Sequence, residues 1–121
     1  MKISLIIDTQ FGGTGKGLLA GYLATKESPD ALMTAWAANA GHTFVDSSGK
    51  KYVHTMLANG IVSNNLKRVF IGPGSLLDLD ALHSEILNNL DLLSKCVIFV
   101  HTNAAVITKE HRDLEFNSML K

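Results

Sequence analysis

The feature that most constrains this chain is a glycine-dense turn that follows an apolar run near the N-terminus. The run spans Ile3 to Ile7, and the turn holds Gly12, Gly13, Gly15, Lys16 and Gly17. Apolar residues then recur at helical spacing from Leu18 to Leu23. The pattern predicts a buried strand over about 2–7, a turn, and a helix over about 15–25. This order is typical of phosphate-binding loops, because glycine lets backbone N–H groups approach an anion at a helix N-terminus.

The turn departs from the standard phosphate-loop pattern, which has Gly, four residues, and then Gly-Lys followed by Ser or Thr. Gly17 follows Gly15 and Lys16, and Gln10 stands where the first glycine is expected. Taken alone, the turn fits two interpretations. Either Lys16 reaches a terminal phosphate as a point charge, or the turn is a glycine-rich connection with a solvated lysine.

The rest of the chain predicts alternating strands and helices. Strands are expected over about 31–38, 68–71 and 95–101, and a hairpin is expected from 43–46 and 51–54 around Ser48 and Gly49. A helix that begins after Asp78 as N-cap and another over about 109–120 complete the pattern. We therefore expect an α/β fold: a P-loop-like, mostly parallel sheet with flanking helices and a β-hairpin insertion, left incomplete in 121 residues.

Composition excludes several classes of protein. The 121 residues suit one small domain, and 11 basic residues balance 11 acidic ones, so there is no basic field for nucleic acid. No apolar stretch is long enough to span a membrane, and none resembles a secretory signal. Cys96 is the single cysteine, which excludes an internal disulfide and fits a reducing compartment. We expect a cytoplasmic protein without nucleic-acid or membrane partners.

A second motif, Asn39-Ala-Gly-His-Thr43, follows the predicted strand at 31–38. Together with TQFGGTGKG, with HTMLANGI at 54–61 and with IGPGSLLDLDAL at 71–82, it resembles the adenylosuccinate synthetase family. The resemblance implies a GTP-dependent ligase that joins L-aspartate to a purine nucleoside monophosphate, with Mg²⁺ as cofactor and a homodimer at full length. Family members are much longer, so residues 1–121 are expected to be the N-terminal part of a single nucleotide-binding ligase domain.

The resemblance also assigns roles to individual positions. His42 matches the family's cation and proton donor, and Lys16 matches the lysine that contacts the transferred phosphoryl group. Gly41 matches a residue whose backbone carbonyl binds Mg²⁺. Gly13 stands where the family has an aspartate that acts as catalytic base and Mg²⁺ ligand. The nucleotide-binding set implied by the resemblance is Gly12, Gly13, Thr14, Gly15, Lys16, Gly17, Asn39, Ala40, Gly41, His42 and Thr43.

Gly13 leaves three explanations open, since it has no side chain to act as base. The protein is an inactive nucleotide-binding relative, or another group such as Asp8 or Thr14 is the base, or the substrate differs. A carboxylate facing ring nitrogen 1 also crowds carbon 2, where guanine carries an amino group and hypoxanthine only hydrogen. Gly13 therefore favours dGMP, as in the phage-encoded branch of the family, in which GTP or ATP is the phosphate donor.

Two other functions compete with this one. The first is an ordinary adenylosuccinate synthetase that acts on IMP with GTP. The second is a generic kinase-like P-loop domain, which is weakened by Gly17 where Ser or Thr would hold Mg²⁺.

Overall fold

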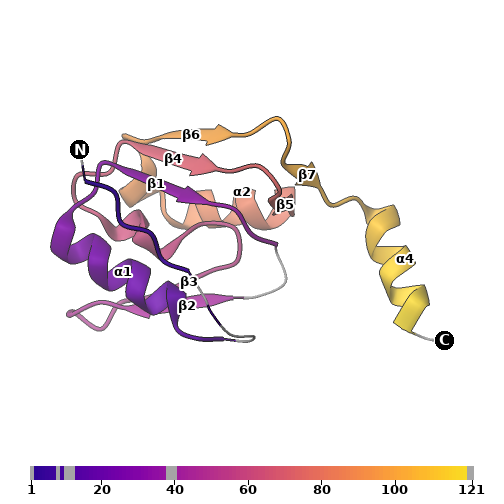
Figure 1. Ribbon diagram of the computed structural model, residues 1–121, viewed down its shortest axis with the longest axis horizontal. Coiled ribbons are helices and arrows are strands. Elements are labelled where there is room, and N and C mark those ends of the chain that lie inside the picture. The colour runs from indigo at the N-terminus through magenta and orange to yellow at the C-terminus, as the bar shows by residue number, and fades with distance from the viewer. Residues whose placement is uncertain (1, 8, 10–12, 38–40, 120–121) are drawn as a thin grey trace.

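The computed structural model describes residues 2–7, 9, 13–37 and 41–119 (Figure 1). Its helices are α1 (Lys16–Glu27), the 3₁₀ helix η1 (Asn59–Val62), α2 (Leu79–Asn88), α3 (Leu90–Leu93) and α4 (Lys109–Met119). Its strands are β1 (Ala31–Thr34), β2 (His42–Val45), β3 (Lys51–His54), β4 (Arg68–Ile71), β5 (Leu76–Leu77), β6 (Val97–Val100) and β7 (Ala105–Val106).

The main sheet is parallel and has the strand order β1-β4-β6. The central strand β4 pairs Val69 with Leu32 on one side and with Ile98 on the other. The chain between β1 and β4 carries the hairpin and η1, and the chain between β4 and β6 carries α2 and α3. Strands β5 and β7 form a second, short parallel pair. The predicted α/β class with a parallel sheet and flanking helices is therefore confirmed.

The predicted hairpin is also confirmed, because β2 and β3 pair in an antiparallel ladder from His42–His54 to Val45–Lys51. Asp46 closes the turn: its Oδ1 accepts hydrogen bonds from the backbone N–H groups of Ser48, at 2.8 Å, and Lys50, at 3.0 Å. Gly49 has a φ of 86°, a left-handed conformation that glycine adopts without strain.

The buried apolar residues form two clusters. The larger lies between the main sheet, η1 and the helices α2 and α3: Met56, Leu57, Ile61, Leu66, Val69, Ile71, Leu77, Leu82 and Leu93. The smaller joins α1 to the hairpin and η1 through Ala24, Phe44, Tyr52 and Val62. The second cluster packs α1 against the hairpin that carries His42.

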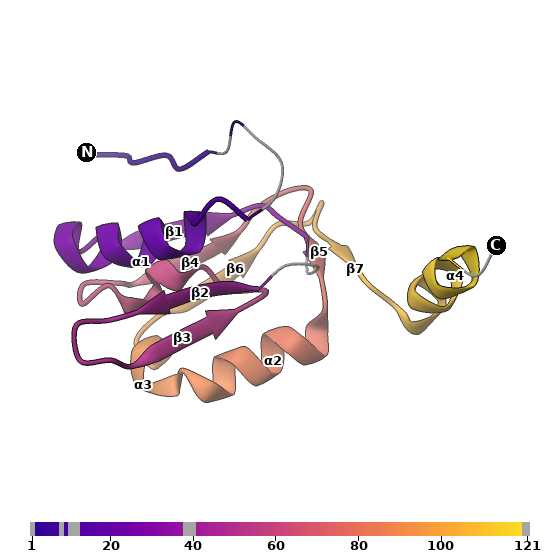
Figure 2. The same ribbon diagram turned by 90° about the horizontal axis from the view of Figure 1, so that it is seen from below.

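The predicted first strand is wrong for the described residues. Residues 2–7 join no sheet, and Ile3 and Leu5 are 77% and 81% exposed. Figure 2 shows the segment running apart from the sheet. The segment is attached to the end of α1. There the Glu27 carboxylate accepts hydrogen bonds from the Lys2 ammonium at 2.8 Å and from the Ser4 hydroxyl at 3.1 Å. An apolar run becomes a strand only where it pairs with a neighbouring strand, and residues 2–7 pair with none of the described strands.

Helix α4 stands away from the other elements (Figure 1), and none of its described residues is buried. The predicted strands at 31–38 and 95–101 are shorter than expected, since β1 ends at Thr34 and β6 spans only Val97–Val100. Among the described residues, no helix is both long enough and apolar enough to cross a membrane.

Candidate functional site

The glycine turn leads into α1 through Gly15, whose φ of 83° lies in the left-handed region. The first helical hydrogen bond runs from the Leu19 N–H to the Gly15 carbonyl at 3.0 Å, and Gly15 is an N-cap residue without a side chain. The first N–H groups of any α-helix have no partner within that helix and carry partial positive charge. The start of α1 can therefore hold an anion, as the glycine pattern predicts.

Two glycines on one face of α1 allow the hairpin to approach the helix closely. A Cβ atom placed on Gly17 would lie 2.6 Å from the Cβ of His42, and one placed on Gly21 would overlap the Phe44 ring. Positions 17 and 21 are one helical turn apart, and positions 42 and 44 share one face of β2. The missing Ser or Thr at position 17 thus has a packing reason: a larger residue would push His42 away from the turn.

His42 is half-buried, and it packs against Trp36 and the Gly17 face of α1. The Trp36 ring lies against it, with 4.6 Å between ring centroids, and the Trp36 indole N–H donates to the Thr55 carbonyl at 3.0 Å. Burial lowers the pKa of His42 most, the Lys16 ammonium beside it lowers it further, and the Glu85 carboxylate opposes them. The structure therefore brings His42 and Lys16 together and favours the neutral imidazole. A bound phosphate would favour the imidazolium form.

The other predicted site residues differ in their exposure and in their surroundings. Gly13 and Gly41 are exposed, and no described residue lies within 4 Å of a Cβ placed on either. Thr14 is half-buried. Thr43 is exposed and lies on the opposite face of β2 from His42, so its side chain does not join the His42 group. Gly12, Asn39 and Ala40, and the alternative base Asp8, lie outside the described residues.

Metal ligands are scarce in the described part of the chain. It contains no group of three or more His, Cys, Asp or Glu residues that could hold a metal ion. Mg²⁺ is usually bound through one or two carboxylates together with substrate phosphates and water. Gly13 and Gly41 could offer only backbone oxygens, so the described residues do not form a side-chain magnesium site.

Sequence reasoning missed a polar network beneath His42. Glu85 accepts hydrogen bonds from the backbone N–H groups of Thr55 at 2.5 Å, Met56 at 3.1 Å and Leu57 at 2.8 Å. It also accepts from the Thr55 hydroxyl at 2.8 Å. The signal was present in the spacing, since Glu85 lies on the same helical face as the core residue Leu82. A carboxylate on the apolar face of a helix indicates buried donors opposite it.

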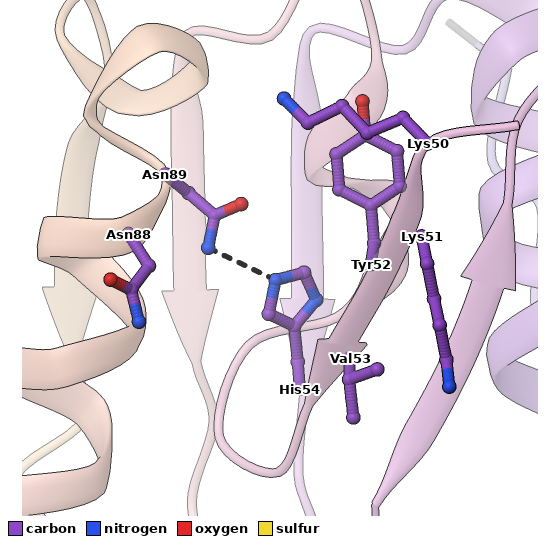
Figure 3. A pocket seen from close by; sticks show the side chains of 7 residues that line it. All are labelled: Lys50, Lys51, Tyr52, Val53, His54, Asn88 and Asn89. Atoms are coloured by element: carbon purple, nitrogen blue, oxygen red, sulfur yellow. Dashed lines mark hydrogen bonds between the residues drawn. The ribbon is translucent and has the colours of Figure 1, made fainter. Parts of the chain in front are cut away.

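The network continues through His54, which is 2% exposed. Its Nδ1 lies 2.6 Å from the Asn59 Oδ1, and its Nε2 lies 3.1 Å from the Asn89 Nδ2. Figure 3 shows His54 of β3 and Asn89, at the junction of α2 and α3, pointing toward one another in a pocket lined by Lys50, Lys51, Tyr52, Val53, His54, Asn88 and Asn89. None of the predicted site residues lines this pocket, so we place the candidate site at the glycine turn and His42.

A parallel α/β sheet with a glycine turn at a helix N-terminus is the arrangement typical of phosphate-binding α/β proteins. Comparison with known proteins gives the particular family. The chain belongs to the adenylosuccinate synthetase family, whose profile matches residues 5–118.

Similar proteins include phage enzymes and cellular ones. The N6-succino-2-amino-2'-deoxyadenylate synthase of Salmonella phage PMBT28 is 52% identical over 99% of this chain and 33% of its own length. The adenylosuccinate synthetase of Pseudothermotoga lettingae is 35% identical over 95% of this chain and 28% of its own length. The chain thus spans about a third of the length of the curated relatives it matches.

Two solved structures share the fold. The succinoaminodeoxyadenylate synthetase of cyanophage S-2L, solved with dGMP and with dATP as an energy donor, superposes with a TM-score of 0.80 at 48% identity. That match covers 92% of this chain and 31% of the cyanophage protein. The fully ligated adenylosuccinate synthetase of Plasmodium falciparum superposes with a TM-score of 0.74 at 25% identity, over 90% of this chain and 25% of that protein.

Proposed function

We propose that this chain supplies the phosphate-binding part of a purine nucleotide ligase that condenses L-aspartate with dGMP. In the proposed reaction, the γ-phosphoryl group of GTP, ATP or dATP is transferred to the 6-oxygen of the purine as ring nitrogen 1 loses its proton. The aspartate amine then attacks carbon 6 and expels inorganic phosphate. The nucleoside diphosphate, phosphate and the succino-nucleotide are the products.

The observation that carries the substrate choice is the open space at Gly13. A Cβ placed there would meet no described residue within 4 Å, and the position lies in the same turn as Lys16. A substrate amino group on carbon 2 needs such space, whereas a carboxylate at this position would crowd it. The names of the phage relatives, and the dGMP bound to the cyanophage structure, support the same choice.

The described residues contribute three functions in this proposal. The start of α1 and Lys16 bind phosphate oxygens, and His42 donates a proton or a hydrogen bond to the 6-oxygen as charge develops there. Mg²⁺ would be bound mainly by the phosphates, with the Gly41 carbonyl as a backbone ligand. The full-length protein is proposed to be a homodimer. The alternative substrate is IMP with GTP, and the alternative role is that of an inactive nucleotide-binding remnant.

Replacing Lys16 with alanine tests the phosphate-binding role. Charged hydrogen bonds are worth about 1.5–3 kcal/mol, so the affinity for the nucleoside triphosphate is expected to fall by about tenfold or more. Titration calorimetry with GTP and ATP measures the change. Lys26→Ala is the matched control, because Lys26 lies in the last turn of the same helix, over the Tyr22 ring. Equal affinities for both variants and the native protein would exclude Lys16 as a phosphate ligand.

Replacing Gly13 with aspartate tests the substrate proposal. The protein must carry the rest of the ligase, either from the reading frame continued past Lys121 or by joining this chain to the remaining part of the cyanophage relative. The added carboxylate is expected to shift the ratio of kcat/KM for dGMP to that for IMP toward IMP by about tenfold or more. Gly13→Ala is the control for backbone effects. An unchanged ratio would remove the reason for preferring dGMP.

A further inference from the structure

Asn59 is a buried residue with an unexplained hydrogen-bond donor. It is the first residue of η1, it is 1% exposed, and its Nδ2 has no hydrogen-bond partner among the described residues. A buried amide N–H without an acceptor costs free energy, so such a group in a folded protein calls for an explanation.

The hydrogen bonds around His54 determine which way the Asn59 amide faces. Asn89 Nδ2 donates one N–H to the Glu85 carbonyl at 2.7 Å, and its other N–H faces His54 Nε2 at 3.1 Å. His54 Nε2 must then accept, which places the ring proton on Nδ1, where it is donated to Asn59 Oδ1 at 2.6 Å. The Asn59 oxygen is thereby used, and its two N–H groups face away from His54.

The free end of Asn59 lies beside His42. A Cβ placed on Gly17 would lie 3.0 Å from Asn59 Nδ2 and 2.6 Å from His42 Cβ, so both groups pack over the same point of α1. Nδ2 is closed off from solvent, so an acceptor from the protein is the simplest partner for it. The neighbouring imidazole has one acceptor nitrogen in its neutral form.

We propose that Asn59 is the positioning residue of His42: its amide donates a hydrogen bond to Nδ1 of His42. The proposed bond requires the His42 ring to turn toward the Asn59 amide. The ring proton then lies on Nε2, the nitrogen farther from the backbone. The relay Asn89–His54–Asn59–His42 thus links the α2–α3 junction to the candidate site. The catalytic value of this tautomer rests on the proposed function, but the hydrogen bond itself does not.

The direct test is nuclear magnetic resonance on the chain labelled with ¹⁵N, at pH 8.5, where histidines are neutral. A scalar coupling between Asn59 Nδ2 and His42 Nδ1 across the hydrogen bond is expected, together with the Nε2–H form of His42. Its absence, with the Asn59 amide bonded instead to a backbone carbonyl of the glycine turn, would overturn the proposal.

Asn59→Asp gives a second readout, because it keeps the shape and the acceptor for His54 while replacing the donor that faces His42 with another acceptor. In this variant His42 is expected to change to the Nδ1–H form. In Asn59→Ala the side chain has neither a donor nor an acceptor, so it favours neither tautomer of His42. If Asn59 served only to fill space, the substitutions would disturb packing, but the tautomer of His42 would be the same in all three proteins. These measurements need no ligase activity, so their failure would leave the proposed function standing.

Discussion

Replacing Glu85 with alanine is expected to lower the free energy of unfolding of the chain by about 3 kcal/mol or more. The Glu85 carboxylate accepts hydrogen bonds from the backbone of three successive residues, Thr55, Met56 and Leu57. Met56 and Leu57 are 2% and 0% exposed, so their amides lose their acceptor in a buried segment. Each donor left buried without an acceptor contributes a penalty of about 1–3 kcal/mol.

The same substitution is expected to loosen the candidate site. The Thr55 carbonyl accepts from the Trp36 indole, and Trp36 packs against His42. Urea unfolding measures the stability, and near-ultraviolet circular dichroism reports the ordering of Trp36. Glu115→Ala on the exposed helix α4 is the control and is expected to change stability by about 0.5 kcal/mol or less. If the Glu85→Ala chain were as stable as this control, the Glu85 carboxylate would not stabilise the segment from Thr55 to Leu57.

Replacing Gly17 with alanine is the second prediction with a large effect. Alanine in a helix ordinarily gains up to about 1 kcal/mol over glycine. Here the new Cβ would lie 2.6 Å from the Cβ of His42 and 3.0 Å from the Asn59 amide nitrogen, so β2 or α1 must move. Overpacking of this kind costs about 1–3 kcal/mol. We therefore expect a net loss of stability, and a further loss of triphosphate affinity because His42 and Lys16 separate.

The matched control for Gly17→Ala is Gly13→Ala, since a Cβ at Gly13 would meet no described residue within 4 Å. Gly13 also has no positive φ, so alanine brings no backbone strain there. Urea unfolding of both variants separates packing at the helix from a general effect of losing a glycine. A Gly17→Ala chain that is more stable than the native one would mean that β2 does not constrain position 17.

Much of the fold follows from local sequence signals. The start of α1 after Gly15, the hairpin at Ser48 and Gly49, and the helix that begins after Asp78 were all predictable. Asp78 caps α2 by accepting from the Ala81 N–H at 3.1 Å, as its position before the helical spacing indicates. These features depend on residues close together in the chain, and their physical causes can be read from the sequence.

The rest depends on contacts between distant segments. The apolar spacing at residues 2–7 predicts a strand but cannot supply the neighbour that a strand needs. Gly17 counted against a phosphate loop in the sequence, whereas the structure shows that the approach of His42 requires a glycine there. Glu85 was assigned no role from the sequence, and its backbone partners lie about 30 residues away. The roles of Lys16, His42 and Gly13 stay predictions.

The measurement that tests the central claim most directly is product formation by the full-length ligase that carries this chain. The protein is incubated with L-aspartate, Mg²⁺ and a mixture of GTP and ATP, with either dGMP or IMP, and succino-nucleotide is followed by mass spectrometry. We predict product from dGMP and a lower kcat/KM with IMP. Product from IMP alone would contradict the assignment of Gly13 to the 2-amino group, and no product from either nucleotide would favour an inactive nucleotide-binding relative.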